Sequence, residues 1–138
     1  MIVKEYQKLN ENEILSLYAA VGWTAYTDDF DALKEGFSRS LLVLAAYEDD
    51  RLMGILRAVG DGATVVFVQD LLVNPADQRK GVGSALLKEL FARYPNVRQI
   101  ELVTDDTEKT KAFYRTAGFV SFQEIGCCGF MWSGSERT

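Results

Sequence analysis

The sequence predicts a mixed α/β (α+β) fold, with one mostly antiparallel sheet of six to seven strands flanked by about four helices. Strand-like and helical patterns alternate in the order β-α-α-β-β-β-α-β-α-β-β. Three successive strands with short turns predict an antiparallel meander, and the strand–helix–strand unit after them predicts a right-handed, parallel crossover. A chain of 138 residues fits a single domain, residues 1–138, with a core at 1–132 and a tail at 133–138.

The chain begins with a strand and a helix. Apolar and polar side chains alternate over residues 2–6, which indicates the strand. Asn10 and Glu13 have the spacing of a capping box, so we expect a helix to begin there and to end at Gly22. Its apolar stripe comprises Ile14, Leu17, Tyr18 and Val21.

A loop over residues 23–26 then leads to a second helix, which Asp28 or Asp29 caps. The meander follows, with strands at 41–47, 52–59 and 64–73. In the last part of the chain we expect helices at 83–94 and 107–117, and strands at 97–103, 119–124 and 130–132.

The composition excludes several kinds of chemistry. Histidine is absent, which rules out Ser-His-Asp and Cys-His catalysis and zinc sites built on histidine, and we expect no metal. Adjacent Cys127 and Cys128 are expected to be reduced thiols rather than a disulfide, redox pair or metal site.

A net charge of −5 disfavours general nucleic-acid binding, because no broad basic surface is available. No apolar run approaches the roughly 20 residues of a membrane span, and no signal or transit peptide is visible. We therefore expect no membrane association and a cytoplasmic location.

A glycine-rich turn after the strand at 64–73 predicts an anion site. Glycines let backbone N–H groups approach a ligand, and a helix N-terminus adds unpaired donors and a positive dipole end. A Walker A loop is excluded because Gly83 is followed by Ser84 rather than lysine. A Rossmann fingerprint is excluded because Leu86 stands where the third glycine is needed.

The hexapeptide that remains is Gln78-Arg79-Lys80-Gly81-Val82-Gly83, a [QR]-x-x-G-x-[GA] pattern. It resembles the acetyl-CoA signature of the Gcn5-related N-acetyltransferase (GNAT) superfamily. Two further segments are similar to that family, the approach Leu71-Leu72-Val73-Asn74-Pro75 and the helix end Phe113-Tyr114-Arg115-Thr116-Ala117-Gly118-Phe119. The resemblance covers residues 64–122 closely and implies an acyl-CoA N-acyltransferase type of fold.

The resemblance implies that acetyl-CoA is the co-substrate. The coenzyme site would comprise Gln78, Arg79, Lys80, Gly81, Val82, Gly83 and Ser84, with the two basic side chains and the backbone amides on the pyrophosphate. The main chain at Leu71, Leu72 and Val73 would pair with the pantetheine arm like an extra strand. Thr107 and Thr110 stand where the family often carries asparagine and alanine. Thr107 could bind the coenzyme, cap the helix, or do both.

Tyr114, in the family's tyrosine position, is the candidate acid that protonates the leaving thiolate. The alternative is a tyrosine packed beside Phe113. Asp70 is the candidate base, although successive strand side chains face opposite ways and only a bulge would redirect it. A structural aspartate and a water chain acting as the base are the alternatives.

We expect Trp23 and Tyr26 to contact the acceptor amine and Phe30 to pack in the core. The predicted reaction is direct attack by a primary amine of a small molecule or peptide in a ternary complex. An acyl-CoA-binding regulator without catalysis and a purely structural module are the alternatives. The protein is expected to be a monomer or a homodimer.

Overall fold

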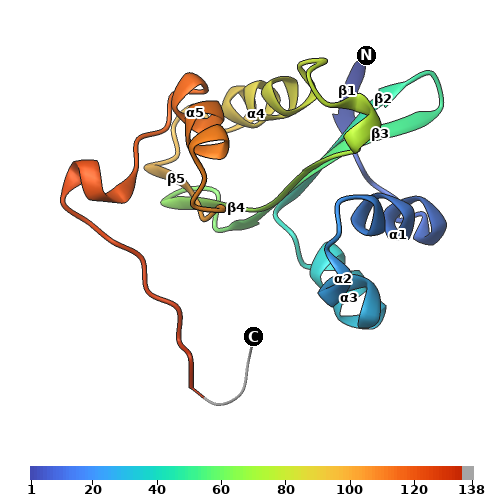
Figure 1. Cartoon of the computed structure of the whole chain (residues 1–138), viewed down its shortest axis with the longest axis horizontal. Coiled ribbons are helices and arrows are strands. Elements are labelled where there is room, and N and C mark those ends of the chain that lie inside the picture. The colour runs from blue at the N-terminus through green and yellow to red at the C-terminus, as the bar shows by residue number, and fades with distance from the viewer. Residues whose placement is uncertain (135–138) are drawn as a thin grey trace. The chain divides into compact units, whose positions relative to one another are not determined.

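The computed structural model describes residues 1–134, so residues 135–138 of the predicted tail lie outside the described part. The chain divides into two compact units, Met1–Val103 and Thr104–Thr138. Both units are drawn in Figure 1. Most of the secondary structure lies in the first unit, which holds the whole described sheet.

The first unit consists of a five-stranded sheet between helices (Figure 1). The strand order follows the sequence: β1 (Ile2–Glu5), β2 (Leu42–Glu48), β3 (Arg51–Gly60), β4 (Val65–Val73) and β5 (Gln99–Leu102). The first three pairings are antiparallel and β4 pairs with β5 in parallel, which confirms the predicted meander and parallel crossover. The helices α1 (Glu11–Ala20), α2 (Thr24–Asp28) and α3 (Phe30–Ser38) lie on one side, and α4 (Val82–Arg93) lies on the other.

The predicted caps are present. The Asn10 side chain accepts a hydrogen bond from the Glu13 N–H at 3.1 Å, and Asp29 accepts one from the Ala32 N–H at 3.2 Å. The capping box at α1 is only half formed, because the Asn10 N–H donates to the Tyr6 hydroxyl instead of the Glu13 carboxylate.

The prediction of six to seven strands is wrong, since the sheet has five. Residues 119–124, predicted as a strand, lead into the short 3₁₀ helix η2 (Phe122–Ile125). The Ser121 hydroxyl donates to Glu124 at 3.0 Å, and Gly126 ends the turn with a φ of 77°. Such local pairing competes with a strand. Residues 130–132 likewise form no strand in the described part of the chain.

The prediction of about four helices is also corrected, because the structure has five α-helices in its described residues. The additional helix is α2, which occupies most of the loop predicted at 23–26. It is a single turn, supported by a hydrogen bond from the Thr27 hydroxyl to the Thr24 carbonyl at 3.0 Å. Its residues lack a buried apolar stripe, so the periodicity that reveals longer helices is missing.

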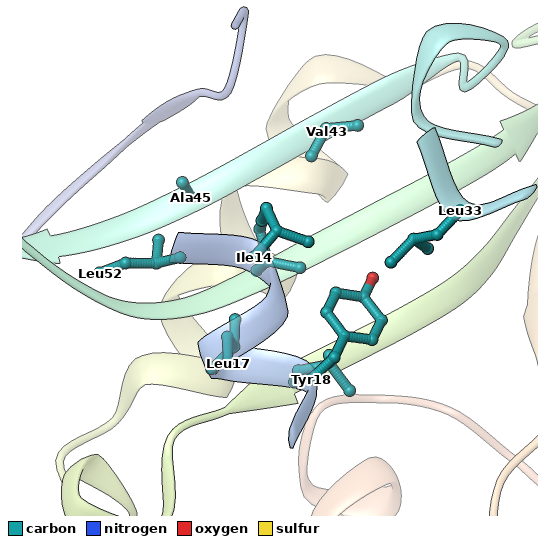
Figure 2. Close-up of a cluster of buried hydrophobic side chains, with 9 residues drawn as sticks. Ile14, Leu17, Tyr18, Leu33, Val43, Ala45 and Leu52 are labelled. Atoms are coloured by element: carbon teal, nitrogen blue, oxygen red, sulfur yellow. The ribbon is translucent and has the colours of Figure 1, made fainter. Parts of the chain in front are cut away.

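A buried apolar cluster fixes α1 and α3 against the sheet (Figure 2). Its members come from two helices and three strands: Ile14, Leu17, Tyr18, Leu33, Val43, Ala45, Leu52, Ile55 and Leu72. Phe30 packs against this cluster, as expected from the sequence. The opposite face of the sheet contacts α4, whose Leu86, Leu87 and Leu90 are buried.

A β-bulge in β4 changes which face its side chains occupy. Arg57 of β3 pairs with Asp70, but the next residue, Ala58, pairs with Val68, so Gln69 is an extra residue. Before Gln69, the even-numbered residues of β4 lie on the face of the sheet that contacts α4, as does Ala58, the partner of Val68. After it, Asp70 and Leu72 point toward α1.

Gly54 of β3 allows α4 to pack closely. A Cβ atom there would lie 2.7 Å from the Leu72 carbonyl oxygen and 2.9 Å from Cγ1 of Val82, the first residue of α4. We expect Gly54→Ala to lower the free energy of unfolding by about 1–3 kcal/mol through overpacking, measured by urea denaturation. Gly129→Ala is the control, because an added Cβ meets nothing within 4 Å there. Equal stability of the two variants would contradict this prediction.

Candidate functional site

The carboxyl-terminal half of β4 has an open edge. β5 pairs with β4 only as far as Val68, opposite Leu102, whereas β4 continues to Val73. Within the described residues no strand pairs with residues 69–73 on that side. Exposed N–H and C=O groups on such an edge can bind an extended ligand as an added strand. The main chain at Leu71, Leu72 and Val73 lies in this segment.

A tight turn connects the open edge to α4. Pro75–Asp77 form the 3₁₀ helix η1, and the Asn74 side chain accepts a hydrogen bond from the Ala76 N–H at 3.0 Å. Arg79 has a φ of 68° and Gly81 a φ of 79°, both in the left-handed region. Glycine adopts this region at no steric cost, whereas arginine does not.

The turn leads to the amino end of α4, whose first backbone N–H groups have no side-chain cap. Gly81 is the N-cap and provides no side-chain cap, so the N–H groups of the first helical turn remain available to a ligand. Val82 and Gly83 are buried and position these amides. The side chains of Gln78, Arg79, Lys80 and Ser84 are exposed around them. The residues predicted from 78 to 84 are therefore brought together at one helix end.

This turn contains a buried carboxylate, that of Asp77. Asp77 is 0% exposed and binds the Arg51 guanidinium through both oxygens, at 2.5 and 2.6 Å. The Lys80 ammonium lies 3.2 Å from Asp77 Oδ1. The hydrogen bonds from Arg51, more than the attraction of Lys80, lower the pKa of Asp77 to about 2. Lys80 thus already has an anionic partner within the protein.

An aromatic cluster lies beside the bulge in β4. The ring of Tyr26 packs edge-on against Tyr18, with ring centres 5.5 Å apart. The ring centre of Trp23 lies 6.3 Å from that of Tyr18 and 6.2 Å from that of Tyr26. Gln69 Nε2 donates to the Tyr26 hydroxyl at 3.3 Å, which joins α2 to the extra residue of β4. The predicted acceptor residues Trp23 and Tyr26 are therefore neighbours, with Trp23 39% exposed and Tyr26 packed against the core cluster.

Asp70 is buried in an ion pair beneath these aromatic rings. Its Oδ2 accepts hydrogen bonds from Arg57 Nε at 2.7 Å and from the Tyr18 hydroxyl at 2.8 Å. Its Oδ1 is buried without a hydrogen-bond partner among the described residues. The bulge at Gln69 is what directs this carboxylate toward α1 rather than α4. Asp70 therefore has a structural role, and its Oδ1 is left without a hydrogen-bond partner among the described residues.

Burial and charge also perturb the partners of Asp70. Burial, followed by the nearby Asp70 charge, raises the pKa of Tyr18, so the phenol stays protonated. Burial alone would lower the pKa of Arg57, but the Asp70 carboxylate outweighs it and the pKa is raised. The Arg57 guanidinium also lies over the Phe37 ring, 5.6 Å from its centre.

The remaining predicted site residues lie in the second unit, which contains α5 (Glu108–Thr116). Thr107 is the N-cap of α5; its hydroxyl oxygen accepts from the Thr110 N–H at 3.2 Å and its hydroxyl lies 2.9 Å from that of Thr110. The capping role of Thr107 is thereby confirmed. Tyr114 packs between Phe113 and Phe119, with ring centres 5.0 and 5.7 Å away. Burial raises the pKa of Tyr114, partly offset by a hydrogen bond with the Thr104 side chain.

Comparison with known proteins identifies the family. Residues 7–119 match the Acetyltransferase (GNAT) family, which is well over half of the chain. The chain belongs to the GNAT family. The open β4 edge, the glycine turn and the α4 amino end are thus features of a GNAT acetyltransferase fold, as the sequence motifs indicated.

Among solved structures, the GNAT family protein SP0256 from Streptococcus pneumoniae TIGR4 is 38% identical, with a TM-score of 0.88 and 98% of each chain covered. An aminoglycoside 6′-N-acetyltransferase complexed with coenzyme A shares the fold, at 20% identity and a TM-score of 0.70, with 86% of this chain and 84% of that chain covered. Histone acetyltransferase TAP1 of Glycine max is 34% identical over 87 residues, which are 62% of this chain. This chain covers only 36% of that relative's length.

Four residues of this region were not predicted from the sequence as site residues: Tyr18, Arg51, Arg57 and Asp77. Tyr18 lies in the apolar stripe of α1, a pattern that is typical of core packing. Arg57 carried a usable signal, since a charged residue inside the apolar strand 52–59 requires a buried partner. The sequence carries no such signal for Asp77, because an aspartate in a turn is ordinarily solvated.

Within residues 1–134, no group of three or more histidine, cysteine, aspartate or glutamate side chains is placed to hold a metal ion. No helix in that part of the chain is long and apolar enough to cross a membrane.

Proposed function

We propose that this GNAT protein transfers an acetyl group from acetyl-CoA to a primary amine by direct attack in a ternary complex. The observation that carries the proposal is the continuous path from the open edge of β4, through the turn at 74–81, to the amino end of α4. An extended pantetheine arm suits the edge, and a pyrophosphate suits the unpaired amides. The solved relative complexed with coenzyme A supports this assignment.

In this proposal the amides of Val82, Gly83 and Ser84 and the exposed Arg79 side chain bind the pyrophosphate. Backbone groups of Leu71, Leu72 and Val73 bind the pantetheine amides, and an N–H near Leu72 or Val73 stabilises the developing oxyanion. Additional coenzyme contacts from Thr107 and Thr110 stay predictions, since each hydroxyl already has a partner in the other.

The chemistry then requires one base and one acid. The attacking amine forms the new C–N bond to give a tetrahedral oxyanion, which collapses as the C–S bond breaks, and the amine proton is released. Asp70 accepts that proton through Oδ1, directly or through a water molecule. Tyr114 donates its phenolic proton to the departing thiolate, which is feasible because burial keeps the phenol protonated.

The acceptor is bound, in our proposal, against Trp23 and Tyr26. The electron-rich faces of these rings attract a substituted ammonium group, and the amine must lose its proton before it attacks. The relatives' names refer to an aminoglycoside and to histones, so both a small molecule and a peptide are candidate acceptors. No observation favours the regulator that binds acyl-CoA without catalysis.

The test is a release assay for free thiol with acetyl-CoA and a panel of polyamines, aminoglycosides, amino acids and peptides. Coenzyme A binding is measured first by isothermal titration calorimetry. We expect binding and amine-dependent thiol release with at least one acceptor class. Tight binding without release across the panel would favour the regulator, and no binding would overturn the proposal.

A further inference from the structure

The Asp77 carboxylate is an unusual neighbour for an anion site. It is 0% exposed, whereas an aspartate in a polar turn is ordinarily in water. It lies on η1, just before the residues proposed to bind pyrophosphate, and its negative charge would by itself repel that ligand. A buried carboxylate in this position therefore requires an explanation other than charge attraction.

The contacts of Asp77 tie the turn to β3. Arg51 is the first residue of β3, and its guanidinium binds both Asp77 oxygens in a bidentate pair. Next to this pair, the Asn74 N–H donates to the Met53 carbonyl of β3 at 2.8 Å. The turn between β4 and α4 is thus held at two points on a strand that belongs to the rigid sheet.

The same contacts separate the roles of the two basic residues in the turn. Lys80 lies 3.2 Å from Asp77 Oδ1, so its ammonium contacts the carboxylate that Arg51 also binds. Arg79 lies between Asp77 and Lys80 in the sequence and has a φ of 68°. No acidic side chain of the described residues forms an ion pair with it. A backbone held in a left-handed conformation at a non-glycine residue needs support from its surroundings.

We propose that Asp77 is a positioning residue for the coenzyme pyrophosphate. Its bidentate pair with Arg51 holds the turn so that Arg79 and the amides at the start of α4 are oriented before the coenzyme binds. This inference rests on the proposed function. It assigns Arg51, on a different strand, to the support of the coenzyme site, and it makes Arg79 rather than Lys80 the main cationic contact.

Electrostatics and positioning predict opposite changes in the affinity for coenzyme A when Asp77 is replaced. Asp77→Asn removes a negative charge beside the pyrophosphate site and releases Lys80, so charge alone predicts tighter binding of coenzyme A. Positioning predicts weaker binding, because a neutral amide no longer accepts both hydrogen bonds from the Arg51 guanidinium. The direction of the change therefore separates the two accounts.

The experiment measures the Kd of coenzyme A by calorimetry for the wild type, Asp77→Asn and Arg51→Gln, with melting curves to verify folding. We expect each variant to bind about tenfold more weakly, with the double variant no weaker than either single one. Arg93→Gln is the matched control, since it breaks an ion pair with Glu5 and Glu89 at the other end of α4 and should leave Kd unchanged. If Asp77→Asn does not fold, Arg51→Lys replaces it, because lysine keeps the positive charge but lacks the guanidinium that forms the bidentate pair.

Two further measurements exclude a merely structural effect. With acetyl-pantetheine as donor, which lacks the pyrophosphate, Asp77→Asn should retain the wild-type kcat/KM. Arg79→Ala should weaken coenzyme A binding more than Lys80→Ala. Equal or tighter binding by folded Asp77→Asn or Arg51→Lys would overturn the inference and leave the proposed function intact. Failure of the wild type to bind coenzyme A would overturn both.

Discussion

Replacing Tyr114 with phenylalanine should lower kcat by about 100-fold or more while changing the Kd for acetyl-CoA by less than about twofold. The substitution removes only the phenolic oxygen. The ring contacts with Phe113 and Phe119 persist, so α5 should keep its packing. A loss confined to turnover is what the removal of an acid that acts on the leaving thiolate produces. The measurement combines steady-state kinetics with calorimetric binding.

The pH profile provides a second expectation for the same residue. Burial raises the pKa of Tyr114 above its ordinary value near 10, so the phenol keeps its proton throughout the neutral range. An acid in its protonated form loses activity only as the pH rises through its pKa. We therefore expect no fall in wild-type kcat from this group below about pH 10.

The matched control is Tyr47→Phe. It removes the same atom from a tyrosine whose hydroxyl donates to Glu13 at 3.1 Å, within the first unit and outside the proposed catalytic residues. Its kcat should remain at the wild-type level. Near-normal turnover of Tyr114→Phe would eliminate Tyr114 as the acid and leave the packing role that the sequence also allowed.

The second large effect concerns stability. Asp70→Leu or Arg57→Met alone should lower the free energy of unfolding by about 3–5 kcal/mol, because each leaves one buried charge without its partner. Both groups are almost fully buried, and the Arg57 side chain is only 7% exposed. The double variant should lose far less than the sum of the single variants, since it leaves neither charge behind. Urea denaturation measures all three.

Arg39→Gln is the control for this series. It breaks an ion pair with Glu35 whose side chains are 78% and 64% exposed, so it should change stability by less than about 1 kcal/mol. Additive losses in the double variant would contradict the pairing. Asp70→Asn tests the base separately: if the folded variant keeps the wild-type pH–rate profile, Asp70 serves structure alone.

The sequence predicted the parts of this site that depend on local pattern. Glycine spacing and the strand-to-helix transition located the turn at 78–84, and apolar periodicity located α1 and α4 to within a few residues. The helix predicted at 107–117 agrees equally closely with α5. Thr107 was predicted as a possible cap and is one. These features depend on interactions within a few residues of one another, which a linear reading can detect.

The features that the sequence did not reveal depend on distant pairings. Tyr18 meets Asp70 across 52 positions, and Arg51 meets Asp77 across 26. Neither pair produces a recognisable pattern among neighbouring residues of the sequence. The prediction of a strand at 119–124 is wrong for the opposite reason. The apolar stretch there is typical of a strand, but the side chain of Glu124 pairs with Arg115 and Ser121 nearby. Local polar contacts prevailed over strand propensity there.

The faces of the last residues of β4 depend on Gln69 standing outside the pairing with β3. If Gln69 took an ordinary place in that pairing, every side chain after it would change faces. Leu72 would then leave the core for the α4 side, and Asp70 would leave Arg57 and Tyr18 behind. Deleting Gln69, by contrast, would make Val68 and Asp70 neighbours opposite Ala58 and Arg57, so the ion pair would keep its face while the strand lost its bulge. The ion pair therefore depends on the absence of residue 69 from the ladder and not on the identity of its side chain.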